Sequence, residues 1–263
     1  MRKGWHTLTP YTIAITGKGG TGKTTIAAAV IAALIRQGHA PVLAVDADPN
    51  SCLDGVLSVE VTKTVGRLRE ESRDAGAGGP AGISKRDLVE LRIAECLVEA
   101  REFDLIAMGR PEGPGCYCYA NNLFKDVIGS LARNYPFIVI DNEAGLENLS
   151  RRLYQSIDLL IITGDPSRRG LATIERLYEL AGEMGIEYDK LALMINLVRD
   201  TTALDDLSAL QLKTSARYLV TLPYNAGLAQ AGERGQSILG VEPSNPVLSR
   251  IGEFITLLGL ENP

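Results

Sequence analysis

Short apolar runs alternate with longer segments of helical periodicity along most of the chain. Continuous apolar runs bounded by turn residues are typical of buried strands, and apolar residues recurring every three or four positions are typical of helices. The runs predict strands at residues 11–16, 42–45, 103–108, 137–140, 159–163, 191–196 and 218–222. The periodic segments predict helices at residues 24–37, near 84–101, from about 121 to 133, and at 246–258, with others between the later strands. This alternation predicts an α/β fold, with a single doubly wound, mostly parallel sheet and helices on both faces.

The chain shows no internal repeat and no linker long enough to separate two domains. We therefore expect one domain over residues 1–263, in which residues 1–10 form an N-terminal extension to which we assign no function. Residues 74–82, which are rich in glycine and alanine, predict a flexible loop, and residues 109–118 predict a loop of glycine, proline and cysteine.

The turn after the first expected strand reads Gly-Lys-Gly-Gly-Thr-Gly-Lys-Thr at residues 17–24 and opens the first expected helix. This context and the spacing G-x-x-x-x-G-K-[ST] predict a phosphate loop, whose glycines let backbone N–H groups turn toward phosphate oxygens. Lys23 is expected to reach the β- and γ-phosphates, and the Thr24 hydroxyl is expected to coordinate Mg²⁺. The dinucleotide pattern G-x-G-x-x-G is also present here, but it leaves Lys23 and Thr24 without a role.

Lys18, directly after the first glycine, is unnecessary for binding the chain's own phosphates, and its alternative interpretation is a solvated surface lysine. Residues 18–25, Lys-Gly-Gly-Thr-Gly-Lys-Thr-Thr, resemble the deviant Walker A class of ATPases, which includes MinD, ParA and the nitrogenase iron protein. The resemblance implies a homodimer on ATP binding, in which Lys18 neutralises charge on the partner's nucleotide as an arginine finger does. The loop residues expected to contact the nucleotide are Gly17, Lys18, Gly19, Gly20, Thr21, Gly22, Lys23, Thr24 and Thr25.

Two acidic positions are expected to complete the reaction centre. By the same resemblance Asp48 is the switch I aspartate, which orients or deprotonates the attacking water, whereas Asp46 closes the second strand as a structural residue. Asp141 ends an apolar strand, as a Walker B aspartate does, and is expected to hold Mg²⁺ through water. The alternative is an acidic residue that ends a strand by chance. The segment that follows, Asn-Glu-Ala-Gly at residues 142–145, resembles the switch II of the class and argues against that alternative.

The base of the nucleotide is expected to be adenine. A guanine site would use N-K-x-D, but the loop that begins at Asn196 has no lysine at 197 and no acid at 199. Asn196, together with Pro223, Tyr224 and Asn225 after a later strand, resembles the adenine-edge contacts of the class. ATP is therefore the predicted substrate.

Cys116 and Cys118 form a Cys-x-Cys pair between an expected strand and an expected helix. In an extended segment residues i and i+2 project the same way, so both thiols would face one point. Soft divalent metals bound by thiolates usually take four ligands, and a twofold dimer supplies the second pair. The alternatives are a redox disulfide and two small buried side chains.

The chain combines four motifs: residues 18–25, 48–53 (Asp-Pro-Asn-Ser-Cys-Leu), 114–118 (Pro-Gly-Cys-Tyr-Cys) and 141–145 (Asp-Asn-Glu-Ala-Gly). Together they resemble the CooC family, ATPases that mature the nickel centre of carbon monoxide dehydrogenase and whose relatives serve acetyl-CoA synthase. The resemblance implies an ATP-dependent nickel metallochaperone, in which Cys116 and Cys118 bind Ni²⁺, or Zn²⁺ in its place, across the dimer interface. Cys52 follows switch I, and we expect it to pack behind the loop, the alternative being a cysteine that responds to nucleotide through that switch. Cys96 lies in a helical segment, and we expect it to lie in the core.

Charge and composition narrow the classes of partner. Lys and Arg number 27 against 32 Asp and Glu, a net charge of −5, which argues against nucleic-acid binding. No apolar run approaches the roughly 20 residues that span a bilayer, and the first residues do not resemble a secretory signal. Four cysteines are then expected to be reduced thiols, and we expect a cytoplasmic protein that binds neither membrane nor nucleic acid.

Two alternative functions belong to the same class. A positioning ATPase of the MinD/ParA type needs a basic amphipathic tail or a basic face, but residues 248–263 contain one Arg against two Glu. An electron donor resembling the nitrogenase iron protein would bridge a [4Fe–4S] cluster with cysteines far apart in sequence, whereas Cys116 and Cys118 are two positions apart.

Overall fold

The computed structural model describes residues 9–67, 91, 93–110, 117–146, 149, 156–199 and 204–261, and their side chains except those of 117–124 and 204–206. Within these residues the strands form one sheet in the order β3-β4-β2-β5-β1-β6-β7-β8. They are β1 (Tyr11–Gly17), β2 (Val42–Asp46), β3 (Val98–Glu99), β4 (Phe103–Ala107), β5 (Phe137–Asp141), β6 (Leu159–Gly164), β7 (Lys190–Val198) and β8 (Tyr218–Pro223). All neighbouring pairs are parallel except β3 and β4. The predicted doubly wound sheet is confirmed.

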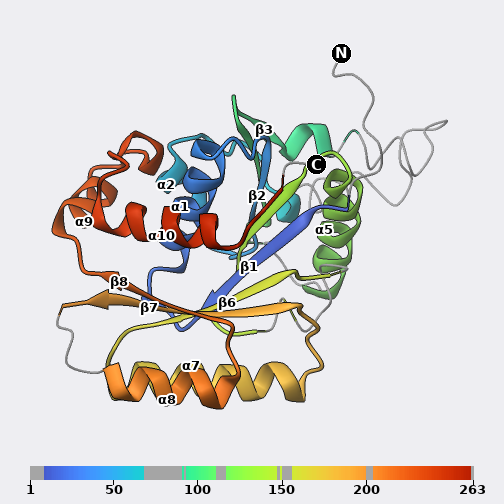
Figure 1. Cartoon of the computed structure of the whole chain (residues 1–263). Helices are drawn as coiled ribbons and strands as arrows, with labels where there is room; N and C mark the ends of the chain where they lie inside the picture. Colours follow the sequence, from blue (N-terminus) through green and yellow to red (C-terminus); the bar gives the residue numbers. More distant parts are fainter. Residues whose placement is uncertain are drawn as a thin grey trace.

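Helices cover both faces of the sheet (Figure 1). On one face lie α1 (Lys23–Arg36), α2 (Leu53–Leu57), α9 (Ala226–Glu233), the 3₁₀ turn η1 (Ile238–Gly240) and α10 (Pro246–Leu257). On the other lie α5 (Tyr117–Ala132), α7 (Arg168–Glu183) and α8 (Leu204–Thr214). The edge-on view in Figure 1 shows α1 and α10 on one side of the strands and α7 and α8 on the opposite side.

Alternating side chains along each strand build two separate cores. Along β1, Ile13 and Ile15 pack in the core beneath α1, whereas Ala14 packs in the core beneath α5 and α7. Because the central strands are buried on both faces, their sequences are continuously apolar rather than alternating. Each strand predicted from an apolar run is therefore present, and β3 is the one that no run predicted.

The helix expected near residues 84–101 differs from the structure. Helix is described only at residue 91 and residues 93–96, and it ends before Val98–Glu99, which pair with β4 as an antiparallel edge strand. Ala100 N donates to Phe103 O at 3.0 Å and to an Asp104 carboxylate oxygen at 3.2 Å. These bonds close a tight turn between β3 and β4, so the backbone pairs as a hairpin instead of continuing as a helix.

The helix expected from about residue 121 begins earlier, at Tyr117. Apolar residues at helical spacing continue back from buried Val127 and Ile128 through residues 120, 123 and 124, which extends the helix toward its N-terminus. Cys118 therefore lies in the first turn of α5 rather than in an extended loop, which corrects the backbone conformation assumed for the Cys-x-Cys pair. Cys116 and the expected loop at 74–82 lie outside the described residues.

Candidate nucleotide site

The predicted site residues meet at the carboxyl edge of the sheet, because parallel strands all end there. Gly17 ends β1, Asp46 ends β2 and Asp141 ends β5, while Asn196 lies near the end of β7. Asp46 and Asp141 are direct partners in the register of β2 and β5. A crevice at this edge is where open α/β sheets bind their ligands.

The phosphate loop depends on two glycines. Gly22 has φ +86°, a left-handed conformation, and a Cβ there would lie 2.5 Å from the Asn196 amide nitrogen. At Gly17 a Cβ would lie 2.4 Å from Thr163 O in the neighbouring strand. Both positions therefore require glycine, one for its backbone conformation and both for close approach. The two glycines allow the tight turn between β1 and α1, and this turn directs the N-terminus of α1 toward the phosphate loop.

Lys23 lies within this loop and is buried. Its Nζ donates to Lys18 O at 3.4 Å, and the Thr21 hydroxyl donates to the same carbonyl oxygen at 2.8 Å. The ammonium group is thus held across the loop at the N-terminus of α1, where an anion is favoured. Lys18 itself is exposed, and its charge contributes to lowering the pKa of Asp165, although the hydrogen bond from the Ser167 side chain contributes most. An exposed Lys18 is accessible to a second molecule.

Asp46 is fully buried and organises the loop that follows it. One carboxylate oxygen accepts from Asp48 N at 3.1 Å and the other from Leu53 N at 3.0 Å. Burial raises the pKa of Asp46 to about 7, against the opposing effect of these two N–H groups and with a further rise from the charge of Asp141. These contacts support the structural role expected for Asp46.

Asp141 lies next to the phosphate loop with one oxygen unpaired. The Thr24 hydroxyl hydrogen-bonds to this carboxylate, and burial raises the pKa of Asp141 to about 6, while Thr24 and the Lys23 charge lower it. Its Oδ1 is buried without a hydrogen-bond partner. A hydroxyl beside a buried carboxylate with a free oxygen fits the ligand set that Mg²⁺ takes with a nucleotide, directly or through water.

Asp48 is half-buried beyond the end of β2. Its Oδ1 accepts from Asn50 N at 2.8 Å and from the Asn50 side-chain amide at 3.0 Å, and Ser51 N donates to Asp48 O at 3.0 Å. The charge of Asp48 raises the pKa of Asp141, so the two carboxylates are close enough to interact. Asp48 is therefore near the phosphate loop, as the motif predicts.

The segment after β5 is bonded directly to β1, which the sequence did not predict. Asn142 N and its side-chain amide both donate to Ile15 O, at 3.2 and 3.0 Å. Gly145 N donates to Gly17 O at 3.3 Å, and the Thr16 hydroxyl donates to Gly145 O. No sequence signal identifies Thr16, because one threonine in an apolar strand looks like any other strand residue.

Of the four residues expected to contact adenine, the two asparagines form hydrogen bonds within the protein, and the other two lie at or just after the end of β8. Asn196 is buried and donates to Thr21 O at 2.9 Å, which supports the phosphate loop. The Asn225 side chain accepts from Leu228 N at 2.8 Å and caps α9. Pro223 ends β8, and Tyr224 after it is exposed, with the guanidinium of Arg199 4.2 Å from the centre of its ring.

Leu197 and Arg199 lie in the expected base loop that begins at Asn196, and no role was predicted for either side chain. Leu197 is partly exposed with φ +61°, a strained conformation for a leucine. It follows Asn196 at the irregularity where β7 and β8 shift register. The contact between the Arg199 guanidinium and the Tyr224 ring places Arg199 beside a predicted adenine contact.

The structure corrects the expectation for Cys52 and confirms the expectation for Cys96. Cys52 is exposed at the start of α2, so the expectation that it packs behind the loop is wrong. Burial, and then the charges of Asp46 and Asp48, raise the pKa of its thiol. Cys96 is buried in the core as expected. Among the described residues no group of three or more His, Cys, Asp or Glu side chains is placed to hold a metal ion.

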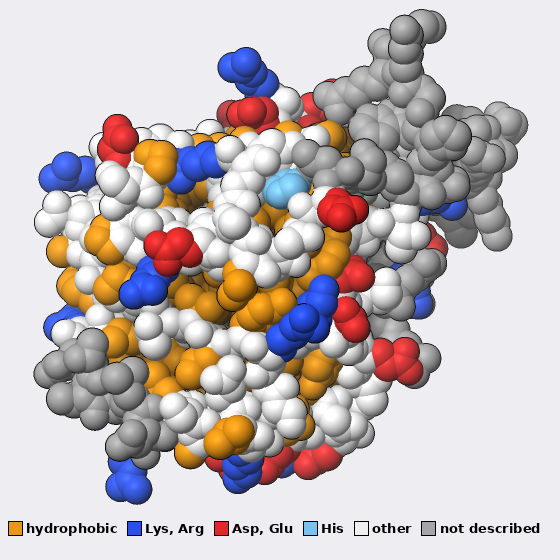
Figure 2. Space-filling model, viewed as in Figure 1, with side chains coloured by type: hydrophobic (Ala, Val, Ile, Leu, Met, Phe, Trp, Pro, Cys, Tyr) orange, Lys and Arg blue, Asp and Glu red, His pale blue; other side chains and the backbone are white. Residues whose placement is uncertain are grey.

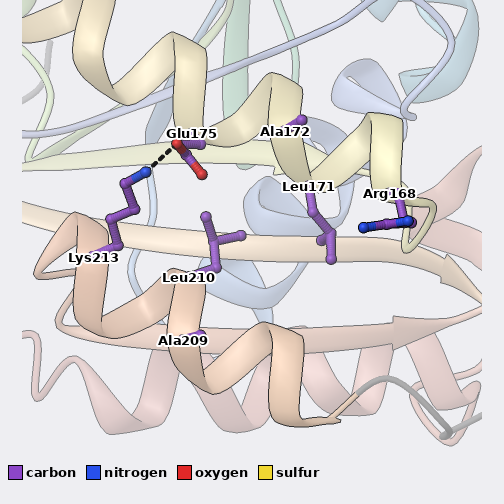
Figure 3. Close-up of a pocket in the computed structure, with 7 residues that line it drawn as sticks. All are labelled: Arg168, Leu171, Ala172, Glu175, Ala209, Leu210 and Lys213. Atoms are coloured by element: carbon purple, nitrogen blue, oxygen red, sulfur yellow. Dashed lines mark hydrogen bonds and ion pairs between the residues drawn. The ribbon is translucent and has the colours of Figure 1, made fainter.

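A surface hollow of about 290 Å³ lies on the opposite face of the sheet from α1, between α7 and α8 (Figure 3). Leu171 and Leu210 line its floor, Arg168 lies at one end, and the ion pair of Glu175 and Lys213 closes the other. None of these residues belongs to the nucleotide site.

A phosphate loop on β1, with acidic residues ending β2 and β5, defines a P-loop ATPase. The CbiA family, described as the CobQ/CobB/MinD/ParA nucleotide binding domain, matches residues 12–238, and the chain belongs to this family. The chain is thus an ATPase of the MinD/ParA type of fold, and members of this class commonly dimerise on ATP.

The chain is similar to an uncharacterized ATP-binding protein of Methanocaldococcus jannaschii, with 41% identity over 92% of this chain and 96% of the relative. It is also similar to the carbon monoxide dehydrogenase accessory protein CooC of Rhodospirillum rubrum, with 28% identity over 88% of this chain and 90% of the relative. Among solved structures, a ParA family ATPase from Chlorobium tepidum matches with a TM-score of 0.72 and 20% identity, over 95% of this chain and 99% of the other. That likeness establishes the fold alone.

Proposed function

We propose that this protein is an ATP-driven metallochaperone that delivers nickel to a client enzyme, a carbon monoxide dehydrogenase or an acetyl-CoA synthase. ATP brings two copies together through their carboxyl edges, and the cysteine pairs of both copies bind one Ni²⁺, or Zn²⁺ in its place. Hydrolysis then separates the copies and releases the metal. The similarity to CooC over most of the chain supports the class of client.

The steps of this cycle in which ATP is bound and hydrolysed use residues of the phosphate loop and the acidic residues beside it. Lys23 and the N-terminus of α1 bind the phosphates, and Lys18 of each copy reaches the other copy's nucleotide. Asp48 orients the attacking water and accepts its proton. Thr24 and Asp141 would hold Mg²⁺, which neutralises charge on the phosphates when bound.

The position of α5 is the observation that supports the proposed metal site. The connection after β4 leaves the carboxyl edge, and α5 returns from it to the start of β5. Cys118, in the first turn of α5, therefore belongs to the same edge of the sheet as the phosphate loop. A dimer that closes over the nucleotides would bring this end of α5 near its copy, which supports a shared thiolate site.

Nickel binding measured with and without a non-hydrolysable ATP analogue tests this function. We expect one Ni²⁺ per two chains with the analogue, and loss of that binding in the Cys116→Ser/Cys118→Ser double variant. Cys52→Ser is the matched control, since Cys52 is an exposed cysteine outside the Cys-x-Cys pair, and it should keep wild-type stoichiometry. Unchanged stoichiometry in the double variant would end the nickel assignment.

The second candidate is a positioning ATPase, because the family to which the chain belongs includes MinD and ParA in its description. Such a protein needs a membrane-binding helix or a basic surface. Most apolar residues of α10, including Phe254 and Ile255, are buried in the core, and only Leu257 at its end is largely exposed among them. No helix in the described part of the chain could span a membrane. On the face shown in Figure 2, side chains of both charges are interspersed. Binding to anionic vesicles or to duplex DNA would support this candidate over the first.

A further inference from the structure

Three consecutive residues of β1 are each hydrogen-bonded to residues 142–145, which we call the switch II segment. Ile15 O accepts from Asn142 N and from the Asn142 side-chain amide. The Thr16 hydroxyl donates to Gly145 O, and Gly17 O accepts from Gly145 N. The segment therefore cannot shift far without changing bonds to the strand that leads into the phosphate loop.

These bonds differ in how easily they break. The bond from Gly145 N to Gly17 O is 3.3 Å long, and Gly145 is half-buried with φ +99°, a conformation open mainly to glycine. Thr16 is fully buried, and its hydroxyl bonds to the carbonyl on the other side of Gly145. The N–H of Gly145 can therefore change its acceptor while the carbonyl stays bound to Thr16.

A phosphate oxygen of ATP is a stronger acceptor for this N–H than a neutral carbonyl oxygen, because hydrogen bonds to charged groups are shorter and stronger. Gly17 opens the phosphate loop, and Gly145 N donates to its carbonyl oxygen, so this N–H points toward the start of the loop in which we propose that ATP binds. Bound ATP would compete with Gly17 O for the N–H of Gly145.

We infer that Thr16 is a positioning residue that couples the switch II segment to the phosphate loop. Its hydroxyl holds Gly145 O as a fixed point while Gly145 N–H moves from Gly17 O to the γ-phosphate. Thr16 therefore affects how well nucleotide binding is converted into hydrolysis, and not how tightly the loop binds nucleotide. This inference rests on the proposed function, in which ATP binds at this edge and residues 142–145 act as switch II.

Thr16→Val removes the hydroxyl and keeps the shape of the side chain, and Thr16→Ser keeps the hydroxyl. Thr214→Val is the matched control, because Thr214 is equally buried in α8 and its hydroxyl likewise donates to a carbonyl oxygen, Leu210 O at 2.9 Å.

We expect Thr16→Val to lower kcat about tenfold with KM for ATP within about twofold, the effect of one lost hydrogen bond. Thr16→Ser and Thr214→Val should hydrolyse ATP at the wild-type rate. If Thr16→Val does not fold, Thr16→Ala replaces it.

Hydrogen exchange of the peptide that contains Gly145 gives a second readout. Adding a non-hydrolysable ATP analogue with Mg²⁺ should slow exchange in the wild type and in Thr16→Ser, and should change it little in Thr16→Val. The inference is overturned if Thr16→Val keeps wild-type kcat, if Thr16→Ser falls as far, or if Thr214→Val lowers kcat equally. If Lys18→Gln and Asp48→Asn lose turnover while Thr16→Val keeps it, the inference alone fails; if Lys18→Gln keeps turnover, the proposed in-trans mechanism fails.

Discussion

Two neighbouring segments at the carboxyl edge are held in place in different ways. Residues 46–53, the switch I segment, fold back on a buried carboxylate, because Asp46 accepts N–H groups from both Asp48 and Leu53. The switch II segment is held from outside, by hydrogen bonds to β1. In the switch I segment, Ala47 N also donates at 2.9 Å to Asp141 O, at the end of the strand that leads into the switch II segment.

This difference separates the roles of the two segments. Two N–H groups of the switch I segment donate to the Asp46 carboxylate, so we expect the state of this segment to depend on the charge of Asp46. The switch II segment shares its hydrogen bonds with the strand that forms the loop, so its state depends on what the loop binds. Variants that act on one segment and not the other test this division.

The largest effect is expected at Lys18, which lies in neither segment. Lys18→Gln removes the charge that we propose to reach the partner's nucleotide, and we expect kcat to fall roughly 1,000-fold, as for an arginine finger. Nucleotide binding should survive, since Lys23 holds the loop. Steady-state ATPase assays with a nucleotide-binding titration measure both, and wild-type turnover would exclude the in-trans role.

The next largest effect is expected in the switch I segment. Asp48→Asn removes the proton acceptor but keeps an oxygen for the Asn50 hydrogen bonds, so kcat should fall roughly 100-fold with KM little changed. Asp54→Asn is the matched control, because Asp54 lies in the adjoining α2, where its carboxylate accepts only from Gly55 N at 2.7 Å among the described residues. Equal activity of the two variants would show that Asp48 does not take part in the reaction.

Stability should fall as pH rises, because of the buried carboxyls. The pKa of Asp46 is about 7 and that of Asp141 about 6, both above the ordinary value of 3.8, so the folded state favours the protonated forms. The resulting stability is fully present below the unfolded pKa and is lost as pH rises through about 6 to 7. Without nucleotide, urea unfolding should show a loss on the order of a few kcal/mol between about pH 5 and about pH 8.

Asp46→Asn should reduce that pH dependence, since the asparagine does not ionise. The remaining slope would come from Asp141, which lies next to the phosphate loop. A slope equal to that of the wild type would mean that Asp46 ionises in the folded protein as it does in the unfolded chain, and the switch I segment would then not depend on its local charge.

The smallest effect is expected at Asn142 in the switch II segment. Asn142→Ala removes the amide donor but keeps the backbone N–H that donates to the same carbonyl, Ile15 O. Unfolding free energy should fall by about 1 kcal/mol, with kcat changed less than in Asp48→Asn. Urea unfolding and the ATPase assay measure these two quantities. A loss of activity as large as that of Asp48→Asn would show that the two segments are not separate.

Some parts of the fold and site follow from local sequence and others do not. The buried strands were predicted because parallel strands covered on both faces are continuously apolar, and the phosphate loop because its glycines and Lys23 form a local motif. The edge strand β3 was missed because two residues that pair at an edge carry no periodic signal. The start of α5 and the exposure of Cys52 were misjudged because helix starts and loop packing depend on neighbours distant in sequence.

The sequence by itself determined the class of this protein, since an apolar strand, a phosphate loop and an acidic strand end are each encoded within a few consecutive residues. Only the tertiary structure decided how the site is held together. Thr16 meets Gly145, and Asn196 meets Thr21, across 129 and 175 positions of sequence. Both bonds join segments distant in the chain that the order of the strands in the sheet brings to one edge, so no local pattern of residues records them.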